Sequence, residues 1–252
     1  MNYLVYPSGI VKVSSRFTPI ELEEGKIEKS EAELMATYSP KAQAEMKAKK
    51  NILEVPRIGV RFRLPAQMDQ IRYFGRGPEE NYCDRYRGTL IGLYEAKAND
   101  LYFPYVRPQE NGHHIDTRWV SATQENGRGL LIQAEKTIEF NALRNSIEDF
   151  DSEEADAPYQ WNNFTPEEIA GRDDAKAKNR RPKQTHINDI EPRNFVEVCV
   201  DHRQQGVAGY DSWGARPIPE ATIYSDEEYN WTFTLIPLSK AGEASSKARL
   251  AY

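Results

Sequence analysis

The chain has 252 residues, of which 39% are hydrophobic, 29% charged and 11% aromatic, which is typical of a globular protein long enough to bury a sizeable core. The formal net charge of −6 argues against a nucleic-acid partner, because such partners favour a basic surface. No apolar run is long enough to span a membrane, and two cysteines are too few for a disulfide framework or a zinc site.

The first predicted element is a β-hairpin over residues 2–17. A Pro-Ser-Gly turn separates two alternating runs, and the second run places Val11, Val13 and Phe17 on one side. Residues 26–50 then break the alternation. They are rich in Ala, Glu and Lys, which predicts two short helices interrupted by a proline.

Alternation with a period of two returns in the middle of the chain. Residues 57–64, RIGVRFRL, predict a half-buried strand with one solvent-facing side. Residues 115–140 predict two strands joined at an Asn-Gly dipeptide, a strong hairpin signal. Trp119 lies in the first of these strands and is expected in the core.

A second stretch, residues 151–183, interrupts the β pattern and runs from acidic to basic. A threonine N-cap, a proline and a glutamate predict a helix start inside it, at Thr165, Pro166 and Glu168. We expect this stretch and residues 26–50 to be exposed insertions on a β scaffold, with their charges in solvent.

The last predicted strands cover residues 194–201 and 229–237, which are rich in β-branched and aromatic residues. Cys199 and Trp231 are expected to pack inside these strands as a reduced thiol and a core indole. Residues 241–252 are predicted to be a disordered tail. Many short strands punctuated by Gly and Pro indicate an all-β antiparallel sandwich or barrel.

No motif carries catalysis by itself. In residues 75–81, GRGPEEN, Glu80 stands where a dinucleotide fingerprint needs its third glycine, which excludes that nucleotide site. His113 and His114 are adjacent and would point to opposite faces of a strand, so we expect no shared metal and place one of them at the lip of a hairpin. Neighbouring carboxylates indicate surface charge, because a retaining glycosidase pair faces across its substrate at roughly 5 Å.

Three longer stretches resemble a known family. They are YFGRGPEENYCDR (73–85), YFPYVRPQENGHHIDTRW (102–119) and GVAGYDSWGARP (206–217). In this order they closely resemble the C-terminal domain of bacterial lacZ-type family-2 β-galactosidases, which in some bacteria is a separate small chain. The resemblance covers one domain over residues 1–240, apart from the two insertions, and leaves residues 241–252 as a tail. The family domain begins with further strands, so we expect a C-terminal portion that lacks the opening strands of its domain.

The resemblance implies a fold and a function. The fold is an antiparallel supersandwich similar to that of galactose mutarotases. The function is a part in the retaining hydrolysis of terminal β-D-galactose residues, as in lactose. The catalytic glutamates and the magnesium and sodium sites lie on a separate (β/α)₈ barrel, which implies that this chain holds no catalytic residue, metal or cofactor. The implied partners are that barrel domain or large chain, a β-galactoside and, as an open possibility, further copies of the chain. The cytoplasm and the periplasm of a bacterium both stay open as its location.

The resemblance also places residues at the sugar. Trp213, with Asp211 and Ser212, stands at the position of the active-site tryptophan. A flat indole packs well on the apolar C–H face of a sugar and contributes about 1 kcal/mol beyond area burial. Seven further residues are predicted at the rim of the site or at an interface: Glu80, Asn81, Glu110, Asn111, His113, His114 and Arg118.

Other readings of the motif residues stay open. A structural polar network is favoured over ligand contacts for Glu80, Asn81, Asp84 and Arg85. The same preference holds for Glu110, Asn111 and Gly112, whose Asn-Gly dipeptide suits a tight turn. Asp116 and Arg118 share a strand face, which favours an ion pair or a domain contact.

Two alternative functions stay open. A free-standing carbohydrate-binding module would need Trp213 in a concave site with polar partners. An aldose-epimerase-like enzyme would need a general acid and a general base. The histidines offer candidates for these roles, although no spacing supports them: His113, His114, His186 and His202.

Overall fold

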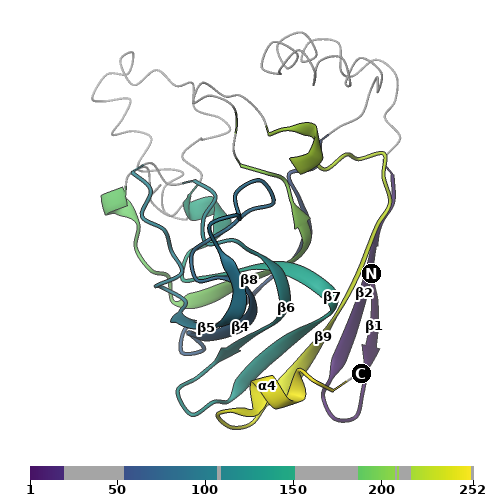
Figure 1. The fold of residues 1–252 in the computed structure, drawn as a ribbon. Helices are drawn as coiled ribbons and strands as arrows, with labels where there is room; N and C mark the ends of the chain where they lie inside the picture. The colour runs from purple at the N-terminus through teal and green to yellow at the C-terminus, as the bar shows by residue number, and fades with distance from the viewer. Residues whose placement is uncertain (20–53, 107–108, 151–186, 208, 210–216, 251–252) are drawn as a thin grey trace, which may run out of the picture.

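The computed structural model describes residues 1–19, 54–106, 109–150, 187–207, 209 and 217–250 (Figure 1). Both predicted helical insertions, 26–50 and 151–183, lie outside the described residues, as do Trp161 and His186.

Antiparallel strands make up most of the regular structure. The strands are β1 (Asn2–Val5), β2 (Val11–Phe17), β3 (Arg57–Pro65), β4 (Gln70–Gly77), β5 (Leu90–Lys97), β6 (His114–Thr123), β7 (Gly129–Leu143), β8 (Phe195–Gln204) and β9 (Tyr229–Leu238). The helices are short: η1 (Ile147–Asp149), η4 (Ile187–Asp189), η5 (Pro219–Ala221) and α4 (Glu243–Lys247). The predicted all-β antiparallel fold is confirmed. Among the described helices, none is long and apolar enough to cross a membrane.

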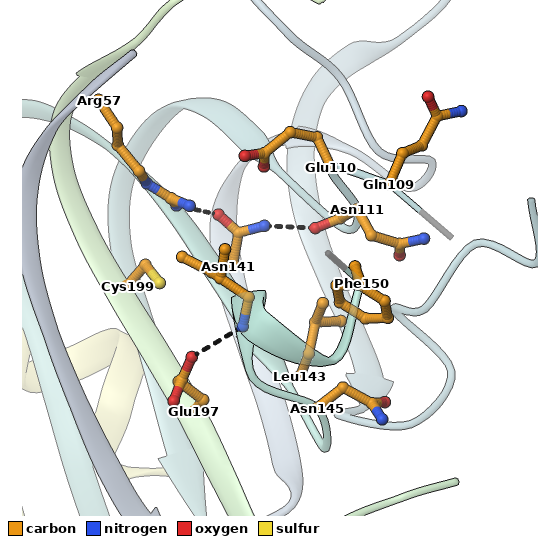
Figure 2. Close-up of a pocket in the computed structure, with 11 residues that line it drawn as sticks. Arg57, Gln109, Glu110, Asn111, Asn141, Leu143, Asn145, Phe150, Glu197 and Cys199 are labelled. Atoms are coloured by element: carbon orange, nitrogen blue, oxygen red, sulfur yellow. Dashed lines mark hydrogen bonds between the residues drawn. The ribbon is translucent and has the colours of Figure 1, made fainter. Parts of the chain in front are cut away.

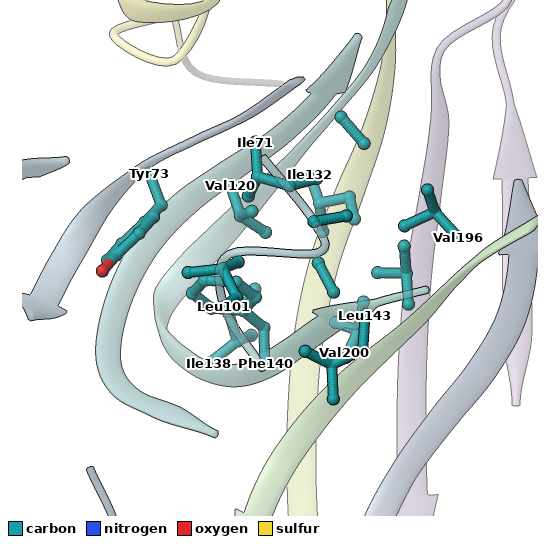
Figure 3. Close-up of a cluster of buried hydrophobic side chains, with 14 of the residues drawn as sticks. Ile71, Tyr73, Leu101, Val120, Ile132, Ile138, Phe140, Leu143, Val196 and Val200 are labelled. Atoms are coloured by element: carbon teal, nitrogen blue, oxygen red, sulfur yellow. The ribbon is translucent and has the colours of Figure 1, made fainter. Parts of the chain in front are cut away.

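Strand β7 joins two parts of the sheet. Its residues 129–134 pair with β9, and its residues 139–143 pair with β8. The order β1-β2-β9-β7-β6-β4-β5 runs through the first part, and β8 and β3 extend the second. Side chains from β4, β6, β7 and β8 meet in one buried cluster (Figure 3). Two sheet portions that share an apolar core form the arrangement of a β-sandwich.

The core explains the alternation in the sequence. Phe140 and Val200 are fully buried in it, and Val60, Phe62 and Leu64 of β3 pack against it from their alternating positions. Each fully buried side chain of this size contributes about 1.5–3 kcal/mol. The half-buried strand predicted for residues 57–64 is therefore confirmed.

Both predicted hairpins are present. The β1–β2 turn contains Gly9 with a φ of 81°, and the β6–β7 turn contains Gly127 with a φ of 82°. These left-handed conformations favour glycine. A Cβ atom on Gly127 would also lie 1.9 Å from the backbone nitrogen of Ala241, so this turn lies directly against the C-terminal segment.

The prediction of a disordered tail is wrong for the described C-terminal residues. Helix α4 packs Ala244 against Trp119, Leu131 and Ile236 on the outer face of the sheet. The amide nitrogen of Gln133 donates hydrogen bonds to the carbonyl oxygens of residues 248 and 250, both at 2.8 Å. The small, polar sequence hides this contact, because its partners lie on distant strands. Trp119 is buried as predicted.

Candidate functional site

The structure brings together the three sequence stretches that carry the resemblance. The backbone nitrogen of Asn81, in the first stretch, donates to the carbonyl oxygen of His113, in the second, at 2.7 Å. A Cβ atom on Gly206, at the start of the third stretch, would lie 2.2 Å from the carboxylate of Asp84. Gly206 in turn donates its backbone N–H to Ala221 at 2.8 Å. The first stretch therefore contacts both of the others.

Glu80 is the centre of a polar network in this cluster. Its side chain is 5% exposed, and its carboxylate accepts hydrogen bonds from the side chains of Arg85 and Tyr105. The same carboxylate accepts the backbone N–H of Gly112 at 2.7 Å. These contacts tie residues 80–85 to residues 105–112, as the polar-network reading of Glu80 and Arg85 predicts.

Asn81 is fully buried and held by backbone groups on both sides of its amide. Its Nδ2 donates to the carbonyl oxygens of Arg76, at 3.0 Å, and Glu79, at 2.9 Å. Its Oδ1 accepts the backbone N–H of Ile115 at 2.9 Å. In this structure the Asn81 amide fixes the backbone of two motif stretches.

His113 and His114 are both fully buried, so the prediction of a histidine at the lip of a hairpin is wrong. The cause is that the β6 strand begins inside the motif cluster. His113 contacts Asn141 through Nδ1 at 2.8 Å and Glu139 through Nε2 at 2.9 Å. Its ring stacks on Tyr82 at 5.4 Å between centroids.

His114 has a different and largely apolar environment. Its ring lies 4.9 Å from that of Tyr73 and 5.1 Å from that of Phe140. Nδ1 lies 3.1 Å from the carbonyl oxygen of Arg76, which requires Nδ1 to carry the proton. Nε2 has no hydrogen-bond partner among the described residues. Burial lowers the pKa of His114 to about 3, so the imidazole is neutral.

A buried ion pair lies beside the cluster. Asp201 of β8 is 1% exposed, and its carboxylate accepts Nε of Arg57 at 2.8 Å. The Arg57 guanidinium also donates to Asn141, whose Nδ2 donates to the carbonyl oxygen of Asn111. A Cβ atom on Gly59 would lie 1.8 Å from the Asp201 carboxylate. Any larger residue at position 59 would therefore clash with the ion pair.

Sequence reasoning missed Arg57, Glu139, Asn141 and Asp201. Alternation places Arg57 on the solvent-facing side of its strand. The register of β3 on β8 sets Asp201 opposite Gly59, within reach of the Arg57 guanidinium. No spacing signal in the sequence marks this pairing, because the two residues are 144 positions apart.

A pocket of about 260 Å³ is lined in part by Arg57, Asn141 and Asn111, the residues linked by hydrogen bonds beside the buried ion pair (Figure 2). Its lining residues are Arg57, Gln109, Glu110, Asn111, Asn141, Leu143, Asn145, Ile147, Phe150, Glu197 and Cys199. Glu110 is exposed at the rim, whereas Asn111 is 2% exposed and exchanges hydrogen bonds with the backbone of Phe103. Cys199 is buried and free, as predicted.

Two carboxylates, Glu110 and Glu197, are among the residues that line the pocket. Glu197 is 3% exposed and is held by Arg63 at 2.9 Å and Arg61 at 3.5 Å. Its strand, β8, is buried on both faces over most of its length. Glu110 is thus exposed to solvent, whereas Glu197 is held in ion pairs.

Arg118 does not form the side-chain ion pair with Asp116 that the sequence favours. The Asp116 carboxylate instead pairs with Arg76 at 2.8 Å. Arg118 donates to the backbone oxygen of Asp116, at 2.5 Å, and its guanidinium lies 5.8 Å from the ring centroid of Phe74. Asp116 has a φ of 54°, a left-handed conformation that is unusual for a residue other than glycine.

The predicted sugar-contacting residues, Asp211, Ser212 and Trp213, lie outside the described residues. Two described residues near this stretch, Val207 and Ile218, are 40% and 59% exposed.

The remaining histidine candidate, His202, is engaged in ring contacts. It lies 5.6 Å from Tyr229 and 5.7 Å from Trp231, measured between ring centroids. Among the described residues, no group of three or more His, Cys, Asp and Glu side chains is placed to hold a metal ion.

Comparison with known proteins gives a consistent match. A family model described as "Beta galactosidase small chain" matches residues 1–235. A β-galactosidase of Priestia megaterium is 34% identical over 218 residues, which are 84% of this chain and 18% of that protein. A β-galactosidase of Streptococcus thermophilus is 29% identical over 197 residues, 78% of this chain and 16% of that protein. The β-galactosidase BgaC of Bifidobacterium adolescentis is 38% identical over 159 residues, 63% of this chain and 12% of that protein. The chain thus spans less than a fifth of the length of these relatives.

Proposed function

The chain belongs to the β-galactosidase small-chain family, and we propose that it completes the sugar site of a retaining β-galactosidase whose catalytic glutamates lie on a separate barrel. The observation that carries this proposal is the contact between the three motif stretches at the base of the Trp213 segment. The chain matches β-galactosidases that are about five times as long as itself. This supports a catalytic domain that lies outside the chain. In this proposal the magnesium and sodium ions that the resemblance implies are held by the barrel.

The role of the chain's own residues is to position one wall of the site. Glu80 and Asn81 fix the first two stretches against each other, and Gly206 seats the start of the third against them. A segment that begins at a fixed point can present Trp213 to the apolar face of a galactoside ring with little loss of conformational entropy. Asp211 and Ser212 would supply polar groups beside that ring.

The proposal is tested by separating the two parts of the enzyme. We expect the purified chain to hydrolyse no chromogenic β-galactoside, and the chain combined with the remaining part of its enzyme to do so. Calorimetry of the isolated chain with galactose and lactose is expected to show no binding, because one wall of a site rarely binds alone. Turnover by the chain alone that a point mutation within it abolishes would overturn the proposal, and sugar binding alone would favour a carbohydrate-binding module.

Trp213→Ala in the complete enzyme is expected to weaken galactoside binding roughly tenfold, which corresponds to about 1.4 kcal/mol. The physical reason is the loss of the flat apolar surface against the sugar. Measured KM and inhibition constants for galactose report the change. Trp213→Phe keeps an aromatic face and serves as the matched control, with an intermediate loss. Unchanged KM and kcat in Trp213→Ala would remove this residue from the sugar site.

A further inference from the structure

Helix α4 covers the outer face of the sheet at β6, but this face is exposed to solvent at β4 and β5. The antiparallel register places Trp119 of β6 beside Phe74 of β4, and Phe74 beside Leu93 of β5, so the three side chains share one face. Trp119 is 7% exposed because it packs in a cluster with Ala244 of α4. Phe74 is 38% exposed and Leu93 is 49% exposed. The apolar layer therefore continues beyond the helix that covers it.

A third apolar side chain extends this bare surface. Ile91 pairs with Arg76 of β4, lies on the same face as Leu93 and is 44% exposed. We call Phe74, Ile91 and Leu93 the outer-face patch. It spans β4 and β5, and β5 is the last strand of the described sheet order. Edge strands are usually protected by charge or by a covering element. Contiguous exposed apolar side chains of this kind mark interaction surfaces.

The border of the outer-face patch carries a cation. Arg118 lies over Phe74, and within the described part of the chain no carboxylate forms an ion pair with it. Its neighbour Arg76 is already paired with Asp116. The surface therefore suits a partner that brings apolar side chains together with a carboxylate for Arg118.

We infer that the outer-face patch docks against the remaining part of the β-galactosidase. This inference rests on the proposed function, since it needs that remaining part to exist. Two facts favour this occupant over a second copy of the chain. The relatives are more than five times as long as the segment they share with this chain, so most of their mass lies outside it. The chain also carries a net charge of −6, so two copies repel each other.

The test places a photo-crosslinking amino acid at position 93 of the complete enzyme. We expect irradiation to link this position to the remaining part of the enzyme. Lys136, which is exposed on the interior strand β7, is the control position and is expected to give at least tenfold less of that product. Links between two copies of this chain, or equal yields from the two positions, would overturn the inference.

Charge substitutions supply a second measurement. Leu93→Asp and Ile91→Asp are expected to weaken association with the remaining part at least tenfold when the two parts are produced separately. Lys136→Asp, at an exposed position of β7, is expected to leave it unchanged. Circular dichroism of each isolated variant shows whether it folds, and the exposure of these side chains predicts that it does. Retained affinity in folded Leu93→Asp and Ile91→Asp would contradict the docking site alone. Failure of the wild-type chain to associate and to restore β-galactosidase activity would contradict the proposed function itself.

Discussion

Replacing Asp201 with alanine is expected to lower the free energy of unfolding by about 3–5 kcal/mol. The Asp201 carboxylate is almost completely buried, and it neutralises the Arg57 guanidinium, whose side chain is 15% exposed. Removing one partner leaves the other as an uncompensated buried charge, which is the costly change at such a pair. Urea unfolding of the isolated chain near neutral pH measures the loss.

Two controls isolate the buried pair. Arg16 and Glu228 form an ion pair whose side chains are 64% and 39% exposed, so Glu228→Ala is expected to cost much less than Asp201→Ala. The double variant Arg57→Met with Asp201→Leu removes both charges and is expected to cost less than Asp201→Ala. If Asp201→Ala costs no more than Glu228→Ala, the buried pair does not stabilise the fold in this way.

This ion pair also shows what the sequence leaves hidden. Alternation correctly predicts the strand over residues 57–64, because burial on one face repeats every second residue. The same rule assigns Arg57 to solvent, since a local pattern carries no information about which strand pairs alongside. The contact with Asp201 follows from the register of β3 on β8. The pairing of distant strands therefore determines which polar side chains meet in the interior. The local sequence pattern determines only where the strands run.

The C-terminal helix shows a related limit. The run from residue 241 to 250 is small and polar, with weak helical signals, and nothing in it predicts burial. Its helix is held because Trp119 and Leu131 present an apolar face on the outer side of the sheet. Local propensity is a weak predictor for such a short helix, because packing supplies most of its stability.

The candidate site was predictable only through the resemblance. Residue spacing gives no reason to bring Glu80, Gly112 and Gly206 together, because each lies in a different loop. The three motifs indicate that these loops act together, and the structure supplies their contacts. Burial of both adjacent histidines was hidden for the same reason, since their surroundings come from β4 and β7.

Acidification is expected to destabilise the domain through His114. Its pKa is about 3 in the folded chain and about 6.5 in an unfolded one. The unfolded state therefore binds more protons between these two values, so stability rises with pH across that window and is constant above it. At about pH 5 the loss relative to neutral pH is about 2 kcal/mol, and it grows until the pH reaches about 3. Urea unfolding at a series of pH values measures the slope.

His114→Phe separates this titration from the others. Phenylalanine keeps a ring between Tyr73 and Phe140 but binds no proton, while giving up the hydrogen bond to Arg76. The variant is expected to lose about 1 kcal/mol near neutral pH and to show a flatter dependence of stability on pH below about 6.5. His202, whose pKa is also lowered by burial, contributes in the same direction. An unchanged slope in His114→Phe would mean that other groups govern the acid sensitivity of this fold.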